Sequence, residues 1–91
     1  MRKNQRRTTQ IYELKDVHTI VYFGLSYNVE RRVKQHVRDG RKIFSSCSII
    51  SPSLSRASAE ALETRKIRGY QAQHGGRPPK YNINKTIRRN K

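Results

Sequence analysis

Two apolar stretches near the start of the chain have the composition of β-strands. Residues 9–14 form the first, and residues 17–24 form a second that is richer in β-branched and aromatic side chains. Residues 15–16 and their neighbours are the predicted turn, and a hairpin centred on Val17 places Tyr12 directly opposite Tyr22 on one face. Opposed residues of an antiparallel pair have Cβ atoms about 5 Å apart. The two phenols then either pack as an ordinary aromatic pair or bring two hydroxyls together in one site.

The next stretch has the pattern of an amphipathic helix. It runs from Asn28 to Asp39, with Asn28 suited to the N-cap position and Gly40 just beyond the last turn. The predicted buried stripe consists of valines four residues apart, Val29, Val33 and Val37. Arg32 and His36 are also four apart, so they lie on one face of this helix, beside the stripe.

Arg32 and His36 are candidates for chemistry on a phosphate. A guanidinium can hold a phosphate through two hydrogen bonds, and an imidazole can exchange a proton near neutral pH. Together with the phenol of Tyr22 they could bind a phosphate and move a proton. The alternative for His36 is a packed or capping histidine, which is the ordinary role of a single histidine.

The second half of the chain contains a third predicted strand and a second predicted helix. Residues 42–50 have strand composition around a middle of small residues, and residues 55–73 are rich in helix formers. Glu63 lies within the apolar stripe of this helix, four residues from both Ala59 and Ile67. An ionised carboxylate in such a place is costly unless a cation or hydrogen-bond donors meet it.

Glu63 has two interpretations. It forms a salt bridge with Lys66 or Arg32, or it is a ligand of a hard divalent cation such as Mg²⁺ or Mn²⁺, which takes carboxylate oxygen and keeps waters for a substrate phosphate. Glu60, one turn away, is the rival acid for the second role. A single acidic ligand would hold such a metal weakly without substrate.

The charge of the whole chain indicates a polyanionic partner. The chain of 91 residues suits one small domain and carries 21 Lys and Arg against 6 Asp and Glu, a formal charge of +15. Nucleic acid fits better than an anionic membrane, because the charges are spread along the chain and no apolar run approaches the ~20 residues of a transmembrane helix. The candidate contacts with nucleic acid, for which an ordinary solvated face is the alternative, are Arg31, Lys34, Arg38, Arg41, Arg65 and Lys80.

The rest of the composition bounds the compartment and the domain. Cys47 is the single cysteine, so no internal disulfide can form, and a reducing, cytoplasmic setting is expected. The basic N-terminus lacks the apolar segment of a signal peptide. Residues 1–8 and 86–91 are predicted to be basic tails around a domain at 9–85, either solvated or in contact with phosphates.

Short motifs in a fixed order resemble the GIY-YIG nuclease family. Residues 10–12 (QIY) and 22–24 (YFG) resemble its two signatures, and Arg32, eight residues after Gly24, matches its catalytic arginine. Residues 62–67 (LETRKI) resemble the segment with the metal-binding glutamate, and residues 79–82 (PKYN) resemble the motif with the supporting asparagine. The family pattern has glycine instead of Gln10, isoleucine instead of Phe23 and often lysine at the position of Leu25, and residues 74–78 resemble an insertion.

The resemblance implies an α/β (α+β) fold, a small three-stranded antiparallel sheet flanked by helices. It also implies a Mg²⁺- or Mn²⁺-dependent DNA endonuclease that acts as a monomer or a transient homodimer on DNA. The residues that it assigns to the site, with Glu63 as the metal ligand, are Tyr12, Tyr22, Arg32, His36, Glu63 and Asn82. On the residues alone, Asn82 is as easily a turn residue. The rival hypothesis is a basic DNA- or RNA-binding module without catalysis, and a ribosome-associated protein is a weaker third.

Overall fold

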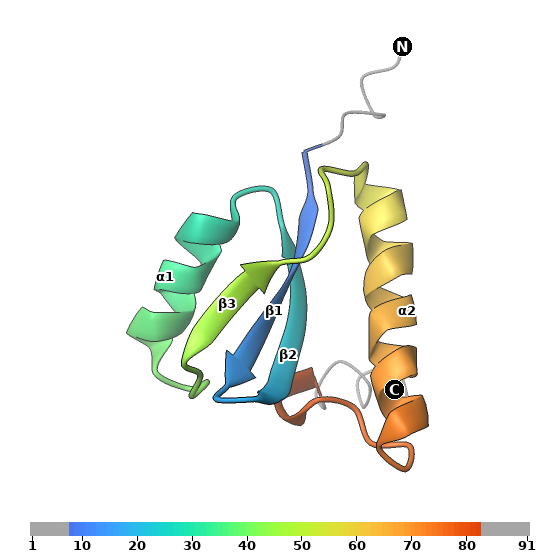
Figure 1. Cartoon of the computed structure of the whole chain (residues 1–91). Coiled ribbons are helices and arrows are strands. Elements are labelled where there is room, and N and C mark those ends of the chain that lie inside the picture. Colours follow the sequence, from blue (N-terminus) through green and yellow to red (C-terminus); the bar gives the residue numbers. More distant parts are fainter. Residues whose placement is uncertain (1–7, 83–91) are drawn as a thin grey trace, which may run out of the picture.

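A three-stranded antiparallel sheet separates two helices that lie on opposite faces (Figure 1). The computed structural model describes residues 8–82. The predicted α+β architecture is therefore confirmed, with the strand order β2-β1-β3, so that the first strand is central. The elements in chain order are β1 Gln10–Asp16, β2 Thr19–Ser26, α1 Val29–Asp39, β3 Ser46–Ile49, α2 Arg56–Gln73 and the 3-10 turn η2 Lys80–Asn82.

The β1–β2 hairpin has a different register from the one that the sequence predicted. Tyr12 pairs with Gly24, and Tyr22 pairs with Leu14, so the prediction that the two tyrosines are directly opposite is wrong. The turn lies at residues 17–18, so the hairpin is centred between them and not on Val17, and a bulge after Leu14 leaves Val21 without a partner across the hairpin. The register has moved by two residues, which keeps the same face. The tyrosines are thus diagonal neighbours, with ring centroids 6.1 Å apart.

The turn itself contains a conformation that few side chains adopt. Val17 has a φ of 63°, which is uncommon for a β-branched residue. Its backbone N–H donates a hydrogen bond to the Ser45 hydroxyl at 2.8 Å. No glycine marks this turn in the sequence, so the pattern does not fix its position.

Helix α1 begins and ends as predicted but buries a different stripe. Asn28 accepts a hydrogen bond from the backbone of Arg31, and Gly40 adopts a left-handed conformation at the C-terminal end. Val29 is buried, whereas Val37 is 65% exposed, so its place in the buried stripe was wrong. The neighbouring His36 is buried instead of Val37, with 4% of its surface exposed. The histidine, not the third valine, therefore faces the sheet.

The third strand is shorter than the predicted 42–50. Only Ser46–Ile49 forms β3, which pairs with β1 so that Tyr12 lies opposite Ile49. Helix α2 begins after Ser55, whose hydroxyl accepts a hydrogen bond from the backbone of Ser58 at 3.2 Å. The described residues contain no helix with the length and apolar character needed to cross a bilayer. The predicted tails lie outside the described residues, apart from Thr8.

Gly24 leaves space for the two tyrosines. A Cβ at this position would lie 2.5 Å from the Tyr12 hydroxyl oxygen and 2.7 Å from Cε2 of Tyr22. Since overpacking a well-packed core typically costs about 1–3 kcal/mol, we expect Gly24→Ala to destabilise the fold by about that amount. Urea unfolding measures the change. The matched control is Gly69→Ala in α2, where an added Cβ meets nothing within 4 Å and the helix gains up to about 1 kcal/mol. Equal effects of the two substitutions would contradict this account.

Candidate active site

A buried hydrogen bond joins the centre of the sheet to helix α1. The Tyr12 hydroxyl lies 2.8 Å from Nε2 of His36. Tyr12 comes from the central strand and is fully buried, and His36 is 4% exposed. The sequence predicted both residues as site candidates, but gave no sign that they contact each other. Their spacing along the chain is 24 residues, and only the packing of α1 on this face of the sheet brings them together.

The environment keeps both partners of this bond uncharged. Burial raises the pKa of Tyr12 well above its ordinary value, the neighbouring Tyr22 raises it further, and the Arg32 guanidinium lowers it in part. Desolvation dominates, so the pKa of the phenol stays above its ordinary value in the free protein despite the nearby guanidinium. Burial and the positive charges of Lys42 and Arg32 lower the pKa of His36 to about 4. At neutral pH the phenol keeps its proton and the imidazole is neutral.

The lowered pKa of His36 predicts a loss of stability on mild acidification. Below its unfolded pKa near 6.5, the unfolded chain binds a proton that the folded state does not take up until about pH 4. Stability therefore falls as pH decreases through this window, by about 2 kcal/mol between pH 7 and pH 5. Urea unfolding at the two pH values measures the difference, with His36→Gln as the comparison. Loss of the same amount in both proteins would contradict the assignment to His36.

Tyr22 completes an aromatic cluster on this face. Its ring lies 5.4 Å from that of His36 in an edge-to-face arrangement and 6.1 Å from that of Tyr12. The ammonium of Lys42 lies above the Tyr22 ring, 4.9 Å from its centroid. Lys42 also lines a hollow of about 320 Å³ next to Arg32 and His36. The sequence analysis missed this lysine, because it placed residue 42 in a strand with no link to the site.

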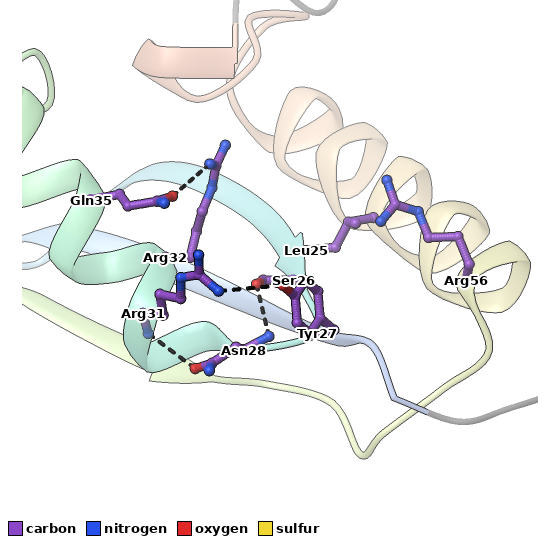
Figure 2. Close-up of a pocket in the computed structure, with 8 residues that line it drawn as sticks. All are labelled: Leu25, Ser26, Tyr27, Asn28, Arg31, Arg32, Gln35 and Arg56. Carbon is purple, nitrogen blue, oxygen red and sulfur yellow. Dashed lines mark hydrogen bonds between the residues drawn. The ribbon is translucent and has the colours of Figure 1, made fainter.

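Arg32 lies between two hollows at the surface beside the cluster. Its guanidinium donates a hydrogen bond to Oε1 of Gln35 at 3.0 Å, and both residues line each hollow. The second hollow has a volume of about 340 Å³ and is shown in Figure 2, where Arg31 and Arg32 project from α1 and Arg56 from α2. Its lining contains three arginines and no acid. Such a lining suits a phosphate, since guanidinium groups bind its oxygens through paired hydrogen bonds.

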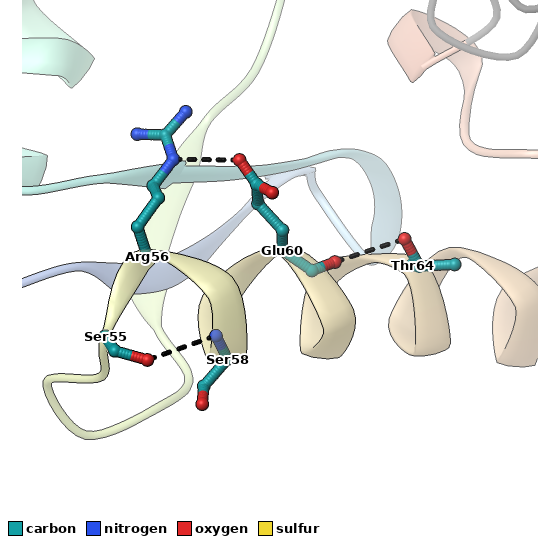
Figure 3. Close-up of polar contacts among 5 residues, drawn as sticks. All are labelled: Ser55, Arg56, Ser58, Glu60 and Thr64. Atoms are coloured by element: carbon teal, nitrogen blue, oxygen red, sulfur yellow. Dashed lines mark hydrogen bonds and ion pairs between the residues drawn. The ribbon is translucent and has the colours of Figure 1, made fainter. Parts of the chain in front are cut away.

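The two acids of α2 have different surroundings. Glu60 is exposed, and its carboxylate accepts a hydrogen bond from Nε of Arg56 at 3.0 Å (Figure 3). Glu63 is only 7% exposed and lies on the same helix face as the fully buried Ala59. The prediction of a buried carboxylate at Glu63 is therefore confirmed. Its role as a metal ligand stays a prediction.

Asn82 secures the open edge of the sheet beside the site. Its side-chain oxygen accepts a hydrogen bond from the Phe23 N–H at 2.9 Å, and its side-chain nitrogen donates one to the Phe23 carbonyl at 3.0 Å. β2 is an edge strand, so these contacts replace a missing neighbouring strand at the residue before Gly24. The amide thus positions the backbone that carries Tyr22 and Gly24.

The predicted nucleic-acid contacts fall into four groups. Arg31 and Arg38 line the two hollows that flank Arg32, while Lys34 and Arg41 are exposed outside them. Arg65 lies elsewhere, in a hollow between β2 and α2. Lys80 is exposed and lies above the Tyr81 ring, 5.3 Å from its centroid.

The first and second α-helices also contribute residues that the sequence analysis missed. Arg56 and Gln35 join Arg32 in one hollow. Arg56 is the first residue of α2 and Gln35 lies in α1, and the sequence shows only the charge of the one and the hydrogen-bonding capacity of the other.

Comparison with models of protein families, with curated proteins and with solved structures finds no match for this chain.

Proposed function

We propose that this protein is a divalent-metal-dependent DNA endonuclease of the GIY-YIG type that hydrolyses phosphodiester bonds. The observation that carries the proposal is the buried contact of 2.8 Å between the Tyr12 hydroxyl and His36 Nε2, next to Arg32. A protein that only binds DNA needs no hydroxyl–imidazole pair in its core. Hydrolysis needs a group that takes a proton from water and another that holds the phosphate.

The Tyr12–His36 pair can take up the proton of the attacking water. With the imidazole neutral and its Nε2 unprotonated, the phenol donates its hydrogen bond to His36 and has an oxygen lone pair left to accept from water. Tyr12 is fully buried in the free protein, so the proposal requires that water gains access to this oxygen when DNA binds. As the water oxygen attacks phosphorus, its proton passes to the Tyr12 oxygen and the phenol proton passes to Nε2. The bond from phosphorus to the leaving oxygen breaks, and that oxygen takes a proton from solvent. No free phenolate is needed, which is consistent with the raised pKa of Tyr12.

A bound phosphate strengthens this relay. Lys42 and Arg32 are two of the causes that lower the pKa of His36. A phosphodiester beside them brings a negative charge that offsets their effect, so the pKa of His36 rises when DNA is bound. His36 then becomes a better proton acceptor in the complex than in the free protein.

Arg32 is the group that we assign to the scissile phosphate. It is the arginine shared by the arginine-lined hollow and by the hollow next to His36. Two N–H groups of its guanidinium can bind two non-bridging oxygens, and this contact strengthens as negative charge builds up on them. Tyr22 and Asn82 are positioning residues in this proposal.

The acid available for a metal suits Mg²⁺ or Mn²⁺ held jointly with DNA. The described residues contain no cluster of three or more His, Cys, Asp or Glu side chains that could form a closed cage. Mg²⁺ usually binds one or two carboxylates, several waters and substrate phosphates, so the single buried carboxylate of Glu63 fits it. When bound, such an ion supplies positive charge at the scissile phosphate and the leaving oxygen.

Nicking of a supercoiled plasmid tests the proposal. We expect the protein to convert supercoiled plasmid to the open-circular form with Mg²⁺ or Mn²⁺ and to leave it intact in EDTA. The rival function, a basic module that binds nucleic acid without catalysis, draws support from the formal charge of +15. It predicts retarded plasmid with no metal-dependent nicking, and that outcome would overturn the nuclease proposal.

A further inference from the structure

A third hollow lies on the opposite face of the sheet from the Tyr12–His36 pair. It lies between the β1–β2 turn, β2 and the second half of α2, and its volume is about 620 Å³. Ligand pockets in proteins have volumes of roughly 300–1,000 Å³. None of its lining residues lines the two hollows around Arg32, and the proposed cleavage chemistry uses none of them.

The charged part of this lining is basic, beside the neutral Thr19 and Gln73. Arg65 and Lys66 come from α2, and His18 comes from the hairpin turn. No Asp or Glu lines the hollow. A cationic peptide is therefore a poor occupant, and a ligand with negative charge is favoured.

The rest of the lining is aromatic and apolar. Tyr70 and His74 stack with their ring centroids 3.7 Å apart and their planes 6° from parallel. Nδ1 of His74 lies 2.8 Å from the Tyr70 carbonyl oxygen, which fixes the orientation of the imidazole. Ile20, Phe23 and Leu62 supply apolar surface. A flat aromatic pair beside cations is the combination that binds single-stranded nucleic acid, with bases on the rings and phosphates on the cations.

A glycine keeps the hollow open. Gly69 lines it from the middle of α2, where glycine weakens a helix relative to alanine. An added Cβ at this position meets nothing within 4 Å. A larger side chain here can therefore be accommodated by the helix and will occupy part of the hollow, which gives a direct way to block it.

We propose that this hollow binds an unpaired base of single-stranded DNA, stacked on the Tyr70–His74 pair, with an adjacent phosphate on Arg65 or Lys66. A duplex hides the faces of its bases, so the hollow distinguishes DNA with an unpaired stretch from fully paired DNA. The proposal goes beyond the nuclease function and does not depend on it, since the two sites share no residue.

Fluorescence anisotropy with the full chain in EDTA tests this selectivity without cleavage. The probes are a short labelled oligothymidylate and a labelled duplex of the same length, and the variants are Tyr70→Leu and Gly69→Leu. Because stacking of a base on an aromatic ring contributes roughly five- to a hundredfold in affinity, we expect each variant to bind the oligothymidylate about tenfold more weakly. Duplex affinity should change less than about twofold, because phosphate contacts dominate it. Ala72→Leu, at an exposed position of α2 outside the hollow, is the matched control and should bind both probes as the wild type does.

Two results would overturn the proposal. One is wild-type affinity of both variants for oligothymidylate, and the other is an equal loss for the two probes. Circular dichroism shows whether Gly69→Leu folds. If this variant does not fold, the proposal is tested by Tyr70→Leu together with photocrosslinking of the wild-type protein to an oligonucleotide that contains bromodeoxyuridine. Crosslinks to the peptide that contains Tyr70 and His74 support the proposal, and crosslinks confined to other peptides contradict it.

Discussion

Glu63→Gln should reduce metal-dependent nicking of plasmid DNA by about a hundred- to a thousandfold, the effect of removing one strong electrostatic contact from an active site. Glutamine has the same shape as glutamate and keeps one side-chain oxygen, but it lacks the charge that holds a hard divalent cation. Glu63 is 7% exposed and lies on the same face of α2 as the buried Ala59, and the substitution leaves the size of the side chain unchanged. DNA binding in EDTA should be unchanged or slightly tighter, because the substitution removes a negative charge.

Glu60→Gln is the matched control for this prediction. Glu60 lies one turn earlier on the same helix, but its side chain is 59% exposed and pairs with Arg56 at the surface. Loss of an exposed ion pair alters stability by at most about 1 kcal/mol. The control should therefore nick plasmid at the wild-type rate. Similar rates for the two variants would exclude Glu63 as the metal ligand.

Tyr12→Phe should reduce the nicking rate by about a hundred- to ten-thousandfold, the usual contribution of general acid–base catalysis. The substitution removes one oxygen atom from a fully buried ring and leaves the ring in place. It deletes both the acceptor for the water proton and the hydrogen bond to His36. An unpaired imidazole nitrogen remains, which costs about 1–3 kcal/mol of stability, so urea unfolding must accompany the rate measurement.

Tyr81→Phe separates this chemical effect from the structural one. The Tyr81 hydroxyl accepts a hydrogen bond from the backbone N–H of Ile43 at 3.0 Å, and the Tyr81 ring packs against the hydrophobic core cluster that contains Tyr12. This control loses one hydrogen bond but no proposed catalytic group. It should be destabilised and still nick DNA at the wild-type rate. If both variants lose activity in proportion to stability, Tyr12 has a structural role only.

The order of strands and helices could be predicted from the sequence because each element carries a local signal. The caps of α1 are an example, since Asn28 and Gly40 occupy the positions that their side chains favour. The burial of Glu63 was also predictable, from its place within an apolar stripe. These features depend on residues close together in the chain.

The hairpin register and the contact partners could not be predicted in the same way. The turn at Val17 lacks a glycine. The position of this turn and the bulge at Val21 together change the partner of Tyr12 from Tyr22 to Gly24. The burial of His36 depends on how α1 lies across the sheet, which its own sequence does not specify. The pattern of valines favoured Val37 instead, and packing of the helix against Tyr12 decided otherwise.

The position of Lys42 follows from the same kind of long-range packing. Lys42 follows the end of α1 by a few residues. The chain turns back at Gly40 toward β3, and this turn brings the Lys42 ammonium over the Tyr22 ring. The raised pKa of Tyr12 is likewise a consequence of burial at the centre of the sheet. Both features affect the chemistry of the site, and both required the three-dimensional arrangement.

The most direct test of the central claim compares the wild-type protein with Tyr12→Phe, purified in parallel, in a single-turnover plasmid-nicking assay with Mg²⁺. Saturating protein makes the rate independent of DNA affinity. We predict EDTA-sensitive nicking by the wild type and a rate at least about a hundredfold lower for the variant. Equal rates, or no metal-dependent nicking by the wild type, would contradict the claim that the Tyr12–His36 pair cleaves DNA.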